Sequence, residues 1–264
     1  MRMTACKTTR CECQLFCAKS AFAHNARMRS LLQFTCCAIL LSLTFTLRAE
    51  PTLPALVAVD VGHTLSAPGA ISARGRTELE FNLALARKLT HALQRLGLRT
   101  ILVNHDGLIE SLEARPRSVP DADFFISIHH DSVSEWELET WWWEGQQHTF
   151  SDRWQGHSMF VSRRNPELER SLLCGSAIGA RMQRMGFEPT EKNARRREYA
   201  DRLHAVHFFD NLVVLHQAVQ PALLFEAGVI KHRDEELLLR DPARQARMAD
   251  AIATGIAACL MAGR

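Results

Sequence analysis

The sequence predicts an α/β fold in which a single, largely parallel, twisted β-sheet carries helices on both faces. Two observations support this prediction. Apolar runs of strand length alternate with amphipathic stretches of helix length from residue 55 to residue 261, a pattern typical of parallel sheets. The run 123–129 is apolar on both faces, as expected of a central strand. With neither an internal repeat nor a second domain visible, residues 50–264 are predicted to form one domain.

The strands of this domain are predicted from short apolar runs. The first run ends in Gly62-His63, and the third begins at Asp123 and ends at His129. Such runs, bounded by turn residues, are typical of buried strands. The predicted strands are 55–60, 100–103, 123–129, 159–162, 212–215 and 222–225.

The helices are predicted from apolar residues at helical spacing and from their end signals. Thr77 can cap the first helix and Gly97 can end it. The predicted helices are 77–97, 168–185 and 234–261, the last with a break at Asp241-Pro242. Pro116 and Pro120 interrupt the segment after the second strand, and residues 132–157 are predicted to be irregular.

The N-terminal region differs from the rest in composition. Residues 1–27 are interpreted as an upstream extension from a misplaced start codon. Residues 28–49 contain an uncharged, mostly apolar run, Leu31 to Leu47, beside Arg27 and Arg29, which indicates a signal peptide or, alternatively, an N-terminal membrane anchor. Either implies export to the periplasm or cell envelope. In an oxidising compartment Cys174 and Cys259 could pair; two buried free thiols are the alternative.

The charge distribution argues against a nucleic-acid partner. Residues 1–49 hold 7 of the 32 Lys and Arg but only one of the 29 Asp and Glu, so the remainder has 25 basic and 28 acidic residues. Phosphate binding needs clustered positive charge. The one basic run, Arg195-Arg196-Arg197, is interpreted as a solvated helix face. Nothing in the sequence implies an oligomer.

Residues able to bind a metal lie at the predicted strand ends. His63 follows the first strand, His129 ends the third, and Glu226 ends the last. In open α/β sheets, ligands bind outside the carboxyl ends of the strands. Two imidazoles, one carboxylate and an open position form a known catalytic zinc arrangement. A second carboxylate could then handle protons, and Glu226 lies in an apolar run where an idle charge would be costly.

The residues alone leave the choice among neighbours open. Glu78 and Glu80 both lie in the first turn of the predicted helix 77–97, and they point to nearly opposite sides. His130 follows His129 and is expected to point to the other face of the sheet. Each His could also be an ordinary hydrogen-bonded residue, so the residues alone are compatible both with a zinc site and with histidines that bind no metal.

Five motifs, in order and with matching separations, resemble those of the zinc-dependent N-acetylmuramoyl-L-alanine amidases of the amidase-3 type. Together they cover about residues 55–260. The motifs are Val59-Asp60-Val61-Gly62-His63 with Pro68-Gly69-Ala70, Thr77 to Leu83, Leu112 to Arg115, Ser127 to Asp131, and Pro221 to Gly228.

The resemblance implies a peptidoglycan hydrolase that cuts the amide bond between N-acetylmuramic acid and L-alanine of the stem peptide. It implies one Zn²⁺ held by His63, Glu78 and His129, which selects Glu78 over Glu80, and Glu226 as general acid/base. The partner would be peptidoglycan or a muropeptide. The chain departs from the family pattern after the opening His, where Thr64-Leu65 replace glycines. Such departures concern loop shape and substrate preference, and none removes a ligand.

Further residues are expected to contact the substrate. Arg115 and Asp131 belong to motifs shared with the family. All five Trp lie within residues 136–154, and Trp141, Trp142 and Trp143 could stack on sugar rings or meet a partner protein from an exposed loop or edge hairpin. The alternative is a small satellite core under a long loop.

Two other functions remain compatible with the sequence. One is a different zinc peptidase that cuts peptide bonds lacking a sugar. The other is a catalytically inactive cell-wall-binding protein or divisome scaffold with the same fold. No Gly-x-Ser-x-Gly element or phosphate-binding Gly-Lys loop is present, which disfavours serine-hydrolase and nucleotide-binding functions.

Overall fold

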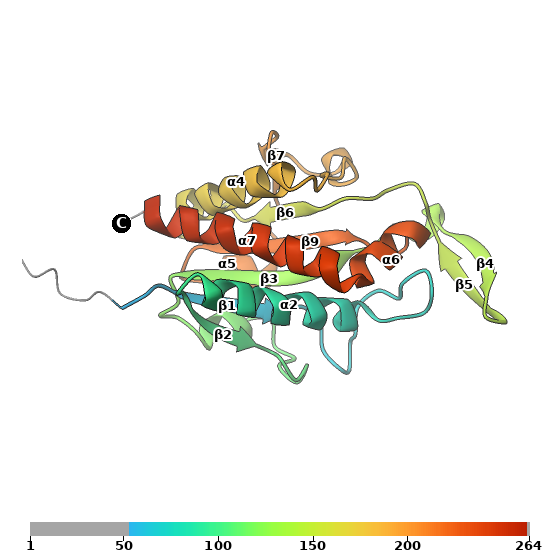
Figure 1. Cartoon of the computed structure of the whole chain (residues 1–264), viewed down its shortest axis with the longest axis horizontal. Coiled ribbons are helices and arrows are strands. Elements are labelled where there is room, and N and C mark those ends of the chain that lie inside the picture. The colour runs from blue at the N-terminus through green and yellow to red at the C-terminus, as the bar shows by residue number, and fades with distance from the viewer. Residues whose placement is uncertain (1–52, 263–264) are drawn as a thin grey trace, which may run out of the picture. The chain divides into compact units, whose positions relative to one another are not determined.

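The structure, a computed structural model, describes residues 53–262 (Figure 1). The segments interpreted as an upstream extension (1–27) and as a signal peptide or anchor (28–49) lie outside these residues. Within the described part, no helix is both long enough and apolar enough to cross a membrane.

The strands are β1 (Leu56–Val61), β2 (Arg99–Val103), β3 (Phe124–Asp131), β4 (Glu139–Trp143), β5 (Gln146–Phe150), β6 (Ser158–Val161), β7 (Tyr199–Asp201), β8 (Val206–Phe208) and β9 (Ala222–Val229). The α-helices are α2 (Glu78–Arg95), α3 (Ala114–Arg117), α4 (Leu168–Arg184), α5 (Val213–His216), α6 (Arg233–Arg240) and α7 (Pro242–Ala262), and the short 3₁₀ helices are η1 (Glu135–Glu137) and η2 (Asn193–Arg195).

The main sheet has seven strands in the order β2-β1-β3-β9-β6-β8-β7. The pairs β1–β2, β1–β3, β3–β9 and β6–β8 are parallel, whereas β6–β9 and β7–β8 are antiparallel. The predicted α/β fold with a largely parallel sheet is therefore confirmed. Strands β1, β3 and β9 lie side by side and run in the same direction, so their carboxyl ends share one edge.

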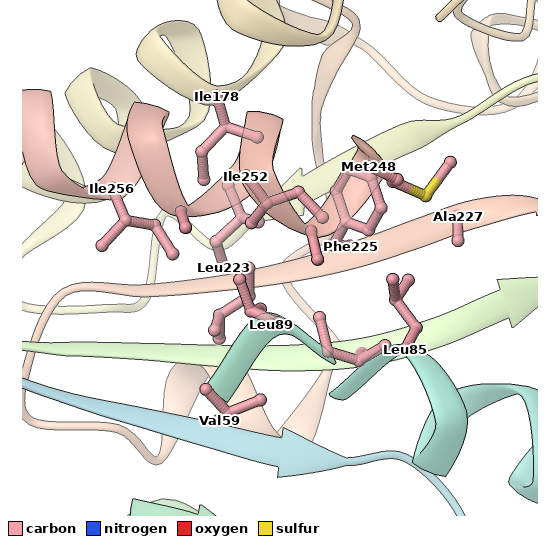
Figure 2. Packing of buried hydrophobic residues seen from close by; sticks show 14 of the residues in the cluster. Val59, Leu85, Leu89, Ile178, Leu223, Phe225, Ala227, Met248, Ile252 and Ile256 are labelled. Carbon is pink, nitrogen blue, oxygen red and sulfur yellow. The ribbon is translucent and has the colours of Figure 1, made fainter. Parts of the chain in front are cut away.

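Helices cover both faces of the sheet. On one face α2, α4 and α7 pack on the strands through a large apolar cluster, in which Leu89, Ile178 and Ile252 meet Val59 and Phe225 (Figure 2). On the other face a smaller cluster joins the short helix α5, through Val214 and Leu215, to the underside of the strands. The central strands are buried from both sides, which explains why their sequences are apolar without alternation.

The segment 212–215 was predicted to be a strand, and this prediction is wrong. Residues Val213–His216 form the short helix α5, begun by hydrogen bonds from the N–H groups of Leu215 and His216 to the carbonyl of Leu212. An apolar run of four residues fits a buried turn of helix as well as a strand, because both conceal every side chain from water.

Two further differences concern segments without a strand prediction. Residues 132–157 were predicted to be irregular, with the tryptophans in an exposed loop or edge hairpin; they contain η1 and, of these two options, the antiparallel hairpin of β4 and β5. Strands β7 and β8, of three residues each, were not predicted at all. The predicted break at Asp241-Pro242 is confirmed, because α6 ends at Arg240 and α7 begins at Pro242.

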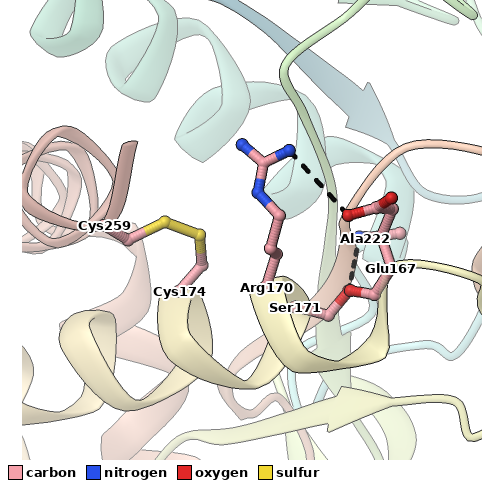
Figure 3. Close-up of a disulfide and its surroundings, with 6 residues drawn as sticks. All are labelled: Glu167, Arg170, Ser171, Cys174, Ala222 and Cys259. Carbon is pink, nitrogen blue, oxygen red and sulfur yellow. Dashed lines mark hydrogen bonds and ion pairs between the residues drawn. A yellow bond between two sulfur atoms is a disulfide. The ribbon is translucent and has the colours of Figure 1, made fainter. Parts of the chain in front are cut away.

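A disulfide joins α4 to α7 through Cys174 and Cys259, whose Cα atoms lie 5.0 Å apart (Figure 3). The two helices are in close contact nearby, since a Cβ on Gly255 would lie only 2.5 Å from the Cα of Ile178. Both half-cystines are buried. Of the two alternatives left open by the sequence, the structure has the paired cysteines.

We expect the double change Cys174→Ala/Cys259→Ala to lower the free energy of unfolding by about 2–4 kcal/mol, because the bridge restricts the unfolded chain across 85 residues. The residues at the strand ends should be unaffected, since the bridge lies in the helical layer away from them. Denaturant unfolding with and without reductant checks this. A reductant effect of equal size in the double variant would contradict it.

Candidate metal centre

The carboxyl ends of β1, β3 and β9 place three of the predicted site residues at one edge. His63 lies two residues beyond β1, and Glu226 in β9 is the register partner of His129 in β3. Glu78 is the first residue of α2, and its N–H donates to the carbonyl of Ala70 at 2.8 Å. The helix therefore begins beside the edge at which α/β proteins bind their ligands.

Three side chains converge there with one donor atom each. Nε2 of His63 lies 2.9 Å from Oε2 of Glu78, and Nδ1 of His129 lies 3.0 Å from Oε1 of Glu78. All three donor atoms lie within 4.8 Å of one another. Burial alone would raise the pKa of Glu78, but the contacts with His129 and His63 outweigh burial and lower it. An ionised carboxylate between two imidazoles suits zinc, with room for a further ligand.

The neighbours that could have competed for this role point elsewhere. Glu80 is exposed, pairs with Arg76 at 3.2 Å and caps the N–H of Thr77. Nδ1 of His130 lies 2.8 Å from Oδ1 of Asn82 inside the protein. Burial lowers the pKa of His130 to about 3, so this imidazole is neutral at physiological pH. The structure thus brings together the side chains of Glu78 and His129, whereas Glu80 points away and His130 contacts Glu78 only through its backbone N–H, at 3.3 Å from Oε1.

His63 is held in an unusual backbone conformation. Its φ angle is +70°, which costs energy for any residue other than glycine. Its carbonyl accepts from Nδ2 of Asn104 at 2.7 Å and from Nη2 of Arg115 at 2.9 Å. The same two side chains also donate to the carbonyl of Val61. These bonds hold the strained turn that aims the His63 ring at Glu78.

Two glycines make room for the converging rings. A Cβ on Gly62 would lie 2.3 Å from Nε2 of His129. Gly69 has a φ of +81°, and a Cβ there would lie 2.6 Å from Oε2 of Glu78 and 2.7 Å from Cδ2 of His63. All three contacts are far inside van der Waals distance, so any larger residue at either glycine would displace a side chain of the candidate site.

Glu226 lies next to this group with an unused carboxylate oxygen. Oε2 is buried and has no hydrogen-bond partner among the described residues. Burial raises the pKa of Glu226 well above its usual range, and the nearby charges of Asp131 and Glu78 raise it further. A buried acceptor without a partner is rare in a folded protein and marks a place where a ligand or water is needed.

A cavity of about 270 Å³ opens beside Glu226. Asp131, a predicted substrate contact, lies in its wall and is bound through both oxygens by Nζ of Lys192 at 2.7 Å, with Nδ2 of Asn193 at 3.0 Å. A second, mostly apolar cavity of about 390 Å³ is lined by His63 and His129. Leu212 lines both cavities, so the hollow lined by Glu226 adjoins the one lined by His63 and His129.

The predicted substrate contacts Arg115 and Trp141 to Trp143 differ in their exposure. Arg115 is 1% exposed, and backbone carbonyls accept from its guanidinium. Trp141 and Trp143 stack on each other, with Arg74 over both rings, and Nε1 of Trp141 donates to the carbonyl of Ala73. Only Trp142 of the three is exposed, at 72%.

The interpretation of Arg195 to Arg197 as a solvated helix face is confirmed only in part, because Arg195 and Arg196 are exposed but the run continues past the end of the helix and Arg197 is half-buried. Arg195 ends the 3₁₀ turn η2, and all three arginines line the cavity beside Glu226. Lys192 and Asn193 of the same loop were missed, as was Asn104. The basic run itself was the signal for the loop, but nothing in the sequence placed that loop against β3 and β9. Asn104 carried no recognisable signal.

The chain is similar to known proteins in sequence and in fold. Residues 57–258 match the family model Amidase_3, N-acetylmuramoyl-L-alanine amidase. A comparison with curated proteins gave no match. Among solved structures, the catalytic domain of CwlV, an N-acetylmuramoyl-L-alanine amidase from Bacillus (Paenibacillus) polymyxa var. colistinus, is 24% identical, covering 77% of this chain and 97% of its own, with a TM-score of 0.59.

Two more solved structures share the fold. The N-acetylmuramoyl-L-alanine amidase from Clostridium difficile 630 is 20% identical over 81% of this chain and 100% of its own, with a TM-score of 0.63. The amidase Ami1 from Mycobacterium smegmatis is 19% identical over 80% and 99%, with a TM-score of 0.64. Since the family model spans most of the domain, the chain belongs to the Amidase_3 family of N-acetylmuramoyl-L-alanine amidases.

Proposed function

We propose that this protein hydrolyses the amide bond between N-acetylmuramic acid and the L-alanine of the stem peptide, with one zinc ion as cofactor. The observation that carries the proposal is the convergence of His63, Glu78 and His129 beside the unpaired oxygen of Glu226. Zinc held by the three donors would polarise the scissile carbonyl and make a water molecule more acidic. The substrate is peptidoglycan or a muropeptide.

Glu226 supplies the proton transfers. Its carboxylate takes a proton from the attacking water as the new C–O bond forms. It then passes this proton to the nitrogen of L-alanine as the C–N bond breaks, so the products are a carboxylic acid and a free amine. Burial favours the protonated form of Glu226, which suits the second transfer. Among the described residues, Asp60 also has a buried carboxylate oxygen without a partner, but its other oxygen accepts from Ser127 at 2.6 Å and lies 3.8 Å from Nη1 of Arg115. Glu226, unlike Asp60, lines the cavity at the strand ends.

The proposal is tested by measuring zinc content together with digestion of labelled sacculi by the purified protein. The expected result is about one zinc per chain, dye release, and a product peptide whose new N-terminus is L-alanine. Cuts within the stem peptide would instead identify another zinc peptidase. Zinc binding with sacculus binding but without any release would identify a catalytically inactive cell-wall protein.

Asn104 and Arg115 act by positioning His63. We expect Asn104→Gly, which keeps the positive φ of residue 104 but removes the amide, to weaken zinc affinity about 10–100-fold. The reason is that the strained carbonyl of His63 then loses one of its two donors. Competition with a chromogenic chelator measures the affinity, and Gln94→Gly on the exposed side of α2 serves as a control. Unchanged affinity would show that His63 holds its geometry without Asn104.

The substrate also indicates where the protein works. Peptidoglycan lies outside the cytoplasmic membrane, so the proposed activity requires export. The basic residues around Met28 and the apolar run Leu31 to Leu47 supply a signal peptide or an N-terminal anchor for that purpose.

The β4–β5 hairpin contributes a sugar-stacking surface through Trp142, whose ring is exposed while Trp141 and Trp143 pack with Arg74. We expect Trp142→Ala to raise KM for polymeric sacculi about two- to tenfold, the value of one aromatic contact, with little change for a small muropeptide. Turnover of both substrates is the measurement. An equal effect on both, or no effect on sacculi, would remove this role.

A further inference from the structure

The cavity beside Glu226 has an excess of positive charge. Its basic residues come from the loop around η2, namely Lys192, Arg195, Arg196 and Arg197, against the acids Asp131 and Glu226. Two of the four cations have carboxylate partners. Lys192 pairs with Asp131 at 2.7 Å, and Arg195 pairs with Glu137 at 3.2 Å.

Arg196 and Arg197 have no carboxylate partner among residues 53–262. The hydrogen bond of the Arg196 side chain goes to the neutral Oγ of Ser134 at 3.1 Å. The guanidinium of Arg197 lies over the ring of Phe209, 3.5 Å from its centroid, and its Nε is buried without a hydrogen-bond partner. Burial lowers the pKa of Arg197, so withdrawal of this cation from water has a cost that a nearby anion would offset.

The position of Arg196 and Arg197 in the cavity lined by Glu226 indicates which part of a substrate would reach these two arginines. In the proposed function, Glu226 delivers a proton to the departing amine, so the cavity that it lines receives the peptide on the amine side. The acyl side then faces the second cavity, where Leu212, Val213 and Leu224 lie beside His63 and His129. The second residue of the stem peptide is a D-glutamate linked through its side chain, and its α-carboxylate is free one residue from the cut bond.

Resting on the proposed function, we propose that Arg196 and Arg197 bind this α-carboxylate and make the enzyme selective for acidic stem peptides over those amidated at the same position. A planar guanidinium presents paired N–H groups that match the two oxygens of a carboxylate. A carboxamide presents an N–H₂ group to these donors and lacks the negative charge. The stacking of Arg197 on Phe209 keeps its plane fixed before the substrate arrives.

The test compares two synthetic N-acetylmuramoyl peptides that differ only in a carboxylate or carboxamide at this position. For the wild-type protein we expect kcat/KM to favour the acid by about tenfold or more, mainly through KM, as for a charge-assisted hydrogen bond. Arg196→Gln and Arg197→Gln, alone and together, should each reduce the preference, and the double variant should bring it close to one. Arg197→Lys separates charge from shape, because it keeps the charge and loses the planar fork.

Matched controls keep the outcomes distinct. Arg170→Gln removes an exposed arginine that pairs with Glu167 on α4 (Figure 3) and should leave the preference intact. Zinc content and melting temperature verify that each variant is folded. Equal cleavage of the two peptides by the wild-type protein, or an unchanged preference in the double variant, would overturn the inference while leaving the proposed amidase activity in place. Cleavage of neither peptide by the zinc-loaded wild-type protein would overturn the proposed function itself.

Discussion

Replacing Glu226 by glutamine is expected to lower peptidoglycan turnover about 10²–10⁴-fold while zinc content stays at the wild-type level. Glutamine keeps the size of the side chain but can neither take a proton from water nor hand one to the leaving amine. Glu226 contributes no atom to the candidate metal site formed by His63, Glu78 and His129, so the three donors should stay together in the variant. The unpaired oxygen of Glu226 is buried, and a neutral side chain there should not destabilise the fold.

The measurement is kcat on labelled sacculi, with zinc content and thermal unfolding recorded on the same preparations. Glu169→Gln, an exposed change on α4, is the matched control and should behave as wild type. Loss of zinc in Glu226→Gln would make Glu226 part of the metal site. Full activity in that variant would assign the proton transfers to another group.

A second large effect is expected from Glu78 but not from Glu80, which lies on the same turn of α2. Glu78→Ala should weaken zinc affinity by more than about 100-fold and reduce turnover to background, since it removes the one carboxylate donor between His63 and His129. Glu80→Ala should retain zinc and activity. Its cost is limited to the helix cap with Thr77 and the exposed ion pair with Arg76, on the order of 1 kcal/mol of stability.

Melting temperature against zinc concentration distinguishes these two variants. A ligand that binds the folded state stabilises it in proportion to the logarithm of its concentration. Wild type and Glu80→Ala should therefore melt higher as zinc is added, and Glu78→Ala should not respond. An equal response of the two variants would remove Glu78 from the ligand set.

Most of the sheet could be predicted because its strands are short apolar runs that end in polar residues. The place of His129 near the end of β3 and the start of α2 after Thr77 could be predicted from local sequence, through strand length and a capping residue. The segment 212–215 could not be assigned in this way. Its conformation follows from packing of Val214 and Leu215 on the second face of the sheet. A run of four apolar residues does not predict that contact.

The same limit applies to the tryptophans and the basic loop. Trp141 and Trp142 are adjacent in the chain, yet one packs beside Arg74 and the other is exposed, because neighbouring residues of a strand point to opposite faces. From its charge alone, Arg197 would be expected at the protein surface. It stacks on Phe209 beside Glu226 only because the loop after α4 folds back over the strand ends.

The sequence by itself determined the chemistry of the site. Residue types at strand ends supplied the two imidazoles and the carboxylate of Glu226, and the start of a helix supplied Glu78, which the family resemblance of Thr77 to Leu83 distinguished from Glu80. Only the tertiary structure decided how these groups are held and what surrounds them. The bonds from Asn104 and Arg115 to the carbonyl of His63 span 41 and 52 residues. The candidate ligands can be recognised from local pattern, whereas the contacts that hold them join segments that meet only when the chain folds.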